Sequence, residues 1–232
     1  MSLVARVGAA VSERLGRDSV VVSSLRPAYE LLLECASLGR GVAWSVNGAP
    51  IRIDARVRHL VPPLAEPEVL AFLREDIRPG ETVLDVGSFL GVYAVFAAQW
   101  AGPKGRVIAV EPTHENHRFI RRHARLNGVA DRVMPVEAAI GAADGAATLY
   151  LHEAPYLNRL GAPDSERAPT GSARTAVRTI DSLCRELDVV PDVIRMDIQG
   201  GELDALRGAR QVIRDGGARL RIVAEMHPRL WG

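Results

Sequence analysis

The chain is poor in several features that would reveal its environment. Its 232 residues include only two cysteines, Cys35 and Cys184, which lie far apart and lack the spacing of metal ligands. We therefore expect two reduced thiols rather than a disulfide or a metal centre. The formal net charge is only +1, which gives no electrostatic case for binding nucleic acid or an anionic membrane.

Long hydrophobic runs are missing as well. No apolar run approaches the eighteen or so residues of a membrane span, and the N-terminus has no signal-peptide pattern. We therefore expect a soluble, cytoplasmic protein. The composition, 47% apolar and 25% charged, fits one globular domain of ordinary size with a small appendage.

A helical and hairpin cap is expected over residues 1–65. The apolar spacing is helical up to about residue 40. Two strand-like runs, 44–46 and 51–53, then flank Asn47-Gly48-Ala49-Pro50. An Asn-Gly pair between strands favours a hairpin, although four intervening residues are a weaker signal than a two-residue loop.

Residues 66–232 alternate strand-like and helical patterns and form the expected main domain. Such alternation indicates right-handed crossovers and therefore an α/β, doubly wound, mostly parallel Rossmann-like sheet. One helix is expected over 202–214, and a long loop over 152–173 is of the length that is usually either functional or disordered. The expected strands are 82–86, 106–110, 132–136, 147–151, 175–179, 192–197 and 219–226.

A glycine-bearing turn follows the first of these strands. Asp85 precedes Gly87, the turn reaches a helix at Gly91, and the next strand ends in Glu111. Glycines allow a tight turn and the close approach of a ligand, and an acid at the tip of the next strand can accept hydrogen bonds from ribose hydroxyls. Asp85 can accept from loop amides or from a cationic amino group.

The spacing of this turn separates two classes of ligand. A pyrophosphate favours a Gly-x-Gly-x-x-Gly turn on a helix N-terminus. The turn here is Asp-x-Gly-x-x-x-Gly and carries Ser88, Phe89 and Leu90. We therefore predict a phosphate-free adenosyl ligand. The alternative is that both glycines merely end a strand and pack a helix.

Over roughly residues 80–227 the chain resembles the S-adenosylmethionine-dependent methyltransferases and, within them, the FkbM family. The run from Asp197 to Glu202 with the Leu-Arg-Gly-Ala behind it is the part most specific to that family. The motifs that carry the resemblance are Val83-Leu84-Asp85-Val86-Gly87 with Gly91, Val110-Glu111-Pro112, Asn116, Leu126-Asn127-Gly128, Ala138-Ala139-Ile140-Gly141, Thr179-Ile180-Asp181-Ser182-Leu183, Ile194-Arg195-Met196-Asp197-Ile198-Gln199-Gly200-Gly201-Glu202, Leu206-Arg207-Gly208-Ala209 and Val223-Ala224-Glu225-Met226-His227.

The resemblance implies a seven-strand methyltransferase fold, S-adenosyl-L-methionine as cofactor, and methyl transfer to a hydroxyl of a small molecule or sugar-like substrate. The turn would face the methionine part of the cofactor, Glu111 its ribose, and the two residues after the third strand its adenine. The expected cofactor-binding residues are Asp85, Gly87, Ser88, Phe89, Gly91, Glu111, Glu137 and Ala138.

Three features depart from the family pattern. Ser88-Phe89-Leu90 stands where the family often has Ala-Asn-Ile, and Gln199 stands where a Glu is usual. The sequence also ends without the last two strands of the full sheet. Either those strands are missing, or the pair 147–151 and 175–179 extends the sheet instead.

Asp197, His227 and Glu202 are the expected catalytic residues. Methyl transfer depends on alignment, and an alcohol acceptor also benefits from a general base. His227 suits that role near neutral pH, the motif favours Asp197, and Glu202 can equally stabilise a helix N-terminus. The residues leave the choice of base open. No metal is expected; a magnesium ion held by Asp197 with Gln199 or Glu225 is the alternative.

We thus expect a methyltransferase with a small-molecule hydroxyl acceptor and with no nucleic acid or membrane partner. The oligomeric state stays open, and a homodimer is compatible with the sequence. One alternative is a non-catalytic, methyltransferase-like binding module. The other is a nicotinamide-dependent oxidoreductase, which the missing Gly-x-Gly-x-x-Gly turn disfavours.

Overall fold

The computed structural model describes residues 20–160 and 168–230. It divides into two compact units, Met1–Pro67 and Glu68–Gly232. The helical pattern expected around Leu15 lies outside the described residues. Among those residues, no helix is long and apolar enough to cross a lipid bilayer.

The N-terminal unit contains a helix and a β-hairpin. Strands β1 and β2 are antiparallel, and Val46 pairs with Ala49, so the turn is the two residues Asn47 and Gly48. Both have positive φ, +48° and +81°, as a type I′ turn requires. The expected four-residue turn is therefore wrong. Pro50 lies within β2. A proline is tolerated in this strand because a two-stranded sheet has only edge strands. The elements of this unit are α2 (Val20–Ala36), β1 (Val42–Val46), β2 (Ala49–Ile53) and the 3-10 helix η1 (Ala55–Leu60).

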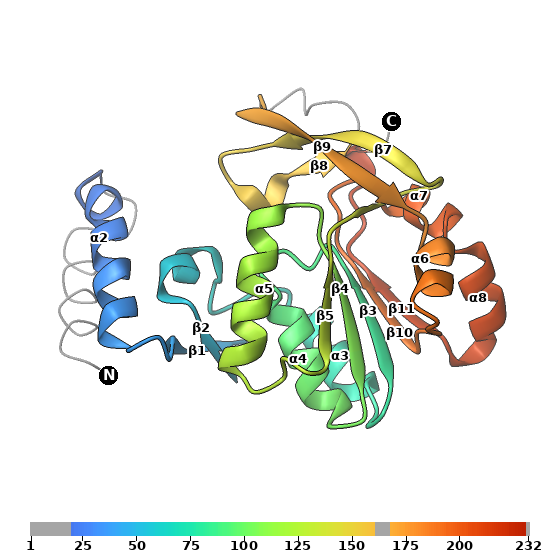
Figure 1. Ribbon diagram of the computed structural model, residues 1–232, viewed down its shortest axis with the longest axis horizontal. Helices are drawn as coiled ribbons and strands as arrows, with labels where there is room; N and C mark the ends of the chain where they lie inside the picture. Colours follow the sequence, from blue (N-terminus) through green and yellow to red (C-terminus); the bar gives the residue numbers. More distant parts are fainter. Residues whose placement is uncertain (1–19, 161–167, 231–232) are drawn as a thin grey trace. The chain divides into compact units, whose positions relative to one another are not determined.

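The C-terminal unit is built on a five-stranded parallel sheet with the strand order β11-β10-β3-β4-β5 (Figure 1). This confirms the doubly wound, parallel α/β fold predicted from the sequence. The chain order reverses between β3 and β10, and ligands in such sheets bind outside the carboxyl ends of the strands at this point. Its strands are β3 (Thr82–Val86), β4 (Arg106–Val110), β5 (Val133–Val136), β10 (Val193–Met196) and β11 (Arg221–Ala224).

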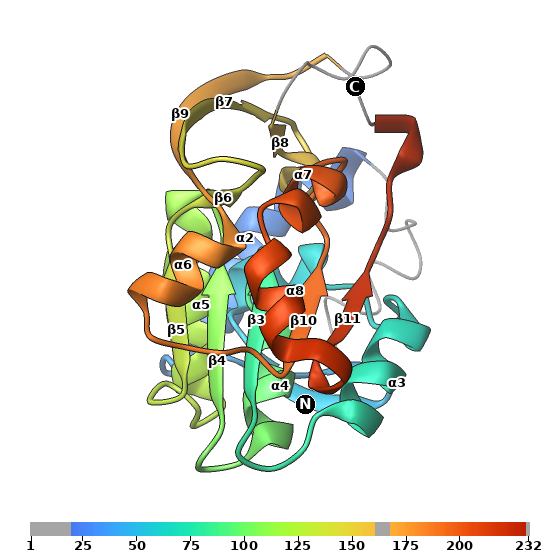
Figure 2. The same ribbon diagram turned by 90° about the vertical axis from the view of Figure 1, so that its right-hand side faces the viewer.

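Helices cover both faces of this sheet, as the two views show (Figures 1 and 2). One face carries α4 and α5, and the other carries α6 and α8, whose apolar residues pack on Leu84, Ile108 and Ile194. The single helix expected over 202–214 is wrong, because two helices separated by Gly208 and Ala209 take its place. The helices are α3 (Pro67–Asp76), α4 (Val92–Ala101), α5 (His114–Leu126), α6 (Ile180–Glu186), α7 (Glu202–Arg207) and α8 (Arg210–Gly216).

The break between α7 and α8 has a long-range cause. A Cβ at Gly208 would lie 2.3 Å from the carbonyl oxygen of Gly141, so only glycine fits this crossing. The amides of Gln211 and Val212, in the first turn of α8, donate to the carboxylate of Asp181 at 2.9 and 2.8 Å. That carboxylate satisfies donors which a helix start otherwise leaves without partners.

A second sheet lies beyond the carboxyl ends of the central strands in both views (Figures 1 and 2). Its strand order is β6-β9-β7-β8. The suggestion that the pair 147–151 and 175–179 extends the main sheet is therefore wrong, because β7 and β9 pair with each other in this separate sheet. Its strands are β6 (Ala139–Ile140), β7 (Gly145–Leu151), β8 (Arg159–Leu160) and β9 (Gly171–Arg178).

The two cysteines differ in exposure, and this difference gives a test of the fold. Cys184 is buried in the core against α8, whereas Cys35 is exposed on α2. Burial, with a smaller contribution from the negative charge of Asp181, raises the pKa of the Cys184 thiol to about 11. At pH 8 we expect one thiol per chain to react rapidly with Ellman's reagent, since only thiolates react.

The second thiol should appear only in guanidinium chloride. The variant Cys35→Ser should have no rapidly reacting thiol and an unchanged melting temperature. Two rapid thiols in the native wild-type protein would contradict the burial of Cys184.

Candidate active site

The turn after β3 is shaped by close packing at the switch point of the sheet. Gly87 has φ +80°, and a Cβ there would lie 1.9 Å from the carbonyl oxygen of Asp197. The amides of Gly87 and Ser88 both donate to the carbonyl of Val110, at 2.9 and 3.0 Å. A side chain at Gly87 would therefore separate the ends of β3 and β10.

Gly91, at the other end of the turn, also packs closely against another element of the protein. It has φ +76°, and a Cβ would lie 3.1 Å from the Cα of Ile120 on α5. The Cβ directions of both glycines thus point at protein atoms. The alternative left open by the sequence was that these glycines merely end a strand and pack a helix. The structure shows this packing role, and it does not depend on any ligand.

Glu111 ties this turn to helix α5. Its buried carboxylate accepts hydrogen bonds from the amide of Phe89 at 3.0 Å, the amide of Thr113 at 2.9 Å and Nδ2 of Asn116 at 3.0 Å. Burial raises the pKa of Glu111, and these hydrogen bonds oppose that rise. Two of the bonds reach Oε1 and one reaches Oε2, so Oε2 retains capacity to accept a ligand hydroxyl.

Asp85 is bonded within the protein. Its side chain is 1% exposed and accepts from Oγ of Ser88 at 2.7 Å and from Nη1 of Arg195 at 3.4 Å. Burial raises the pKa of this carboxyl, and the positive charge of Arg195 opposes the rise. Ser88 is buried too. A bound ligand would therefore sense Asp85 mainly through its charge and through the backbone that it holds.

Arg195 is a central residue that the sequence reasoning missed. Besides Asp85, its guanidinium donates to the carbonyl of Gly87 at 3.1 Å and to Oδ2 of Asp197 at 3.2 Å. It also lies 4.4 Å from the ring centroid of Tyr93. The available signal was one charged residue inside the buried strand β10, where Arg195 is directly opposite Asp85 in the parallel register.

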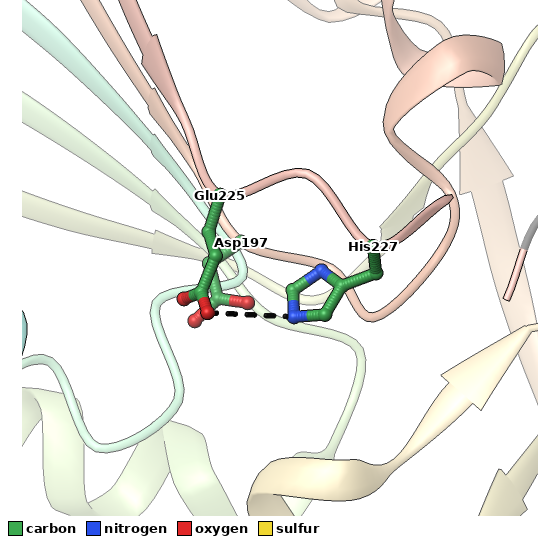
Figure 3. Close-up of side chains that lie close together, drawn as sticks. All are labelled: Asp197, Glu225 and His227. Carbon is green, nitrogen blue, oxygen red and sulfur yellow. Dashed lines mark ion pairs between the residues drawn. The ribbon is translucent and has the colours of Figure 1, made fainter. Parts of the chain in front are cut away.

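Of the expected catalytic residues, Asp197 and His227 lie close together beyond the ends of β10 and β11 (Figure 3), and Glu202 reaches them from the start of α7. Nδ1 of His227 lies 2.9 Å from Oε1 of Glu202, a fully buried carboxylate that also accepts from the amide of Gly200. Nε2 of His227 lies 3.1 Å from the amide nitrogen of Gln199, which donates to Asp197 at 3.1 Å. Asp197, Glu202 and His227 therefore belong to one connected network.

Glu225 completes this group. Its Oε1 lies 3.6 Å from Nε2 of His227, and Asp197 lies beside it (Figure 3). Met196 pairs with Ala224 in the parallel register, so the residues that follow them, Asp197 and Glu225, leave adjacent strands at the same level. The structure thus brings two carboxylates and an imidazole to the switch point.

The remaining expected residues lie toward β5 and the second sheet. Glu137 is exposed and pairs with Nδ1 of His114 at 2.8 Å, whereas the side chain of Ala138 is buried. Phe89 has φ +50°, and its ring contacts Tyr156 edge-to-face at a centroid distance of 6.5 Å. Tyr156 belongs to the segment between β7 and β8, so this segment contacts the turn from Asp85 to Gly91.

The charges at this edge fit the expected adenosyl ligand better than a phosphate. Glu111 and Asp197 directly follow strands β4 and β10, and Asp85 lies one residue before the end of β3 between them. Arg195 lies among them, but it is buried and already paired with two of these carboxylates. An acidic edge favours a ligand with hydroxyls and positive charge.

Comparisons with known proteins identify relatives of this chain. The sequence model described as the methyltransferase FkbM domain matches residues 85–231. A protein-L-isoaspartate O-methyltransferase of Methanopyrus kandleri is 37% identical over 106 residues, 44% of each chain. A ribosomal protein L11 methyltransferase of Pelotomaculum thermopropionicum is 43% identical over 68 residues, 29% of this chain and 21% of that protein. The match thus spans less than half the length of either relative.

Two solved structures are similar to part of this chain. A methyltransferase FkbM from Methylobacillus flagellatus is 22% identical with a TM-score of 0.42, over 64% of this chain and 38% of that chain. A precorrin-6y C5,15-methyltransferase from Geobacter metallireducens is 19% identical with a TM-score of 0.41, over 69% of this chain and 62% of that chain.

The close approach at Gly87 can be tested by substitution. Gly87→Ala adds left-handed strain of about 1–2 kcal/mol to the overlap with Asp197, and we expect a total loss of unfolding free energy above about 3 kcal/mol. The matched control is Gly80→Ala. Gly80 has φ +91°, and a Cβ there meets no heavy atom within 4 Å among the described residues.

Chemical denaturation measures both variants against the wild type. The control Gly80→Ala should lose only the part of the unfolding free energy that the left-handed backbone conformation costs an alanine. Equal losses for the two variants would show that the Gly87 contact with Asp197 is not tight.

Proposed function

This chain belongs to the FkbM methyltransferase family, and we propose that it transfers a methyl group to a hydroxyl of a small molecule or sugar-like acceptor. The family match confirms the resemblance predicted from the sequence, and the cofactor is S-adenosyl-L-methionine. The acceptor and the roles of individual residues are our proposals. The observation that carries them is the convergence of Asp197, Glu225 and His227 at the switch point.

We propose that the turn from Asp85 to Gly91 and the carboxylate of Glu111 hold the cofactor. Oε2 of Glu111 would accept from the ribose, and its bond to the Phe89 amide keeps the turn against it. Glu137, Ala138 and Phe89 would border the adenosyl group. The acidic strand ends supply negative potential for a cationic ligand.

When bound, S-adenosylmethionine supplies a methyl group on a cationic sulfur, which the acceptor oxygen attacks as the carbon–sulfur bond breaks. The chain has to align the acceptor and take up its hydroxyl proton. We assign the proton to the group of Asp197, Glu225 and His227. Glu202 orients His227 through the 2.9 Å contact at Nδ1, which directs Nε2 toward the acceptor.

A protein acceptor is the second candidate, because the two curated relatives are named as an isoaspartate and a ribosomal protein methyltransferase. A panel of sugars, small alcohols, phenols, an isoaspartyl peptide and ribosomal protein L11 would separate the classes. The readout is formation of S-adenosylhomocysteine. Turnover of hydroxyl compounds alone supports our proposal, and turnover of a protein acceptor alone overturns it. Cofactor binding without any turnover across the panel would favour a non-catalytic module.

Cofactor binding can be tested before any acceptor is known. We expect calorimetry to show one site per chain for S-adenosylhomocysteine. Glu111→Gln should weaken the binding of S-adenosylhomocysteine about 10- to 100-fold, because the loss of one hydrogen bond to a charged group changes an affinity by about this factor. Glu115→Gln, an exposed glutamate in the first turn of α5, is the matched control and should bind normally.

Thermal melting of each variant separates folding from binding. If Glu111→Gln folds and binds as the wild type does, Glu111 is not the ribose acceptor. If the wild type binds neither S-adenosylmethionine nor its product, the proposed function fails.

The role of Glu202 predicts a specific kinetic pattern. With an accepted substrate, His227→Ala should reduce kcat by about 100-fold or more, and Glu202→Gln should reduce it less while leaving KM for the cofactor unchanged. An unchanged kcat in His227→Ala would remove His227 from the proton transfer.

A further inference from the structure

Two carboxylates lie side by side at the carboxyl ends of β10 and β11. Like charges at the same level on neighbouring strands are destabilising unless something neutralises them. Arg195 is bonded to Oδ2 of Asp197, on the side toward β3. The Glu225 side of the pair faces His227 (Figure 3). One ligand-type atom from each of Asp197, Glu225 and His227 lies within 4.8 Å of the other two.

The imidazole of His227 is held in a fixed orientation. Its Nδ1 lies 2.9 Å from Oε1 of Glu202, a carboxylate that is 0% exposed. A carboxylate accepts hydrogen bonds, so Nδ1 carries the hydrogen, and in the neutral imidazole Nε2 presents a lone pair on the side of Asp197 and Glu225. A histidine that binds a metal through one nitrogen and donates to a carboxylate with the other is the usual arrangement at metal centres.

The distance between Nε2 of His227 and Oε1 of Glu225 is too long for a hydrogen bond but suits two ligands of one metal ion. Nε2 and Oε1 are 3.6 Å apart, beyond the range of an N–H···O hydrogen bond. Two atoms that each lie about 2.1 Å from one tetrahedral ion are about 3.4 Å apart. Asp197 and Glu225 have side chains that are 20% and 44% exposed, so small rotations can bring all three atoms to one ion.

Gln199 places a fourth group at the same point. Its amide nitrogen lies 3.1 Å from both Oδ1 of Asp197 and Nε2 of His227. Rotation of the amide by half a turn presents its carbonyl oxygen instead, which is a metal ligand. Gln199 has φ +53°, a left-handed conformation that is strained for a residue with a side chain. Such strain is concentrated at functional sites.

We propose that Asp197, Glu225 and His227 bind one divalent transition-metal cation, with Gln199 as a further ligand. The imidazole favours Mn²⁺ or Zn²⁺ over Mg²⁺, which prefers oxygen ligands. This departs from the metal-free site expected from the sequence. The cation would hold the acceptor oxygen and lower the pKa of its hydroxyl. Nε2 of His227 would then be a ligand, and this role would replace the general-base role proposed for it above. The catalytic role of the cation, unlike the binding itself, rests on the proposed function.

The test is a titration of the chelator-treated, full-length chain with MnCl₂ at pH 7.5, without cofactor or acceptor. Free Mn²⁺ is measured by electron paramagnetic resonance. We expect one site per chain with a dissociation constant below the order of 100 µM. Asp197→Asn, Glu225→Gln and His227→Ala should each weaken binding at least about tenfold.

The matched control is His114→Ala. His114 also lies beside a carboxylate, Glu137, at 2.8 Å, but it is not part of a group of three ligands among the described residues. Its removal should leave Mn²⁺ binding unchanged. Cobalt substitution gives a second readout, because the d–d absorption of Co²⁺ should lose intensity or shift in His227→Ala.

Two results would overturn the proposal. One is the absence of stoichiometric binding. The other is binding that survives all three substitutions. Calorimetry with S-adenosylhomocysteine in the presence of chelator tests the proposed function separately, so the failure of either idea can be recognised.

Discussion

The buried guanidinium of Arg195 is the interaction on which the site depends. It joins β3 to β10 at the switch point by contacting Asp85, Asp197 and the carbonyl of Gly87. One contact is in strand β3, one is in the turn from Asp85 to Gly91, and one is in the group of Asp197, Glu225 and His227. Removing one partner of such a buried network leaves a charge without compensation, which is strongly destabilising. The arrangement therefore couples the integrity of the sheet to the geometry of the chemistry.

Much of the central sheet was predictable from local pattern. Strands β3 and β4 have the bounds expected from their apolar runs, because a parallel strand covered on both faces is apolar along its whole length. The hairpin turn was misjudged because Ala49 and Pro50 are poor strand formers, yet pairing with β1 includes both in β2. The break at Gly208 depends on Gly141, and that contact has no local signal.

The site likewise contains residues that the sequence predicted and residues that it did not. Asp197 and His227 were expected from their motifs, and the register of β10 and β11 explains why Glu225 joins them. Arg195 was not foreseen, because its partner Asp85 lies 110 positions away in the sequence. The inward orientation of Asp85 and Ser88 was also unforeseen. A motif identifies which residues gather at a ligand, but it does not distinguish those that touch the ligand from those that support the residues that do.

The packing of Gly87 has a consequence for how relatives are recognised. Its Cβ position is occupied by the backbone of Asp197, so selection for folding alone is enough to retain this glycine. A descendant that had lost methyl transfer would keep Gly87 for as long as it kept its sheet. Under our proposal His227 has a polar atom that serves the reaction, so this position would drift first. Inactive members of such a lineage should therefore be sought by the histidine that they lack.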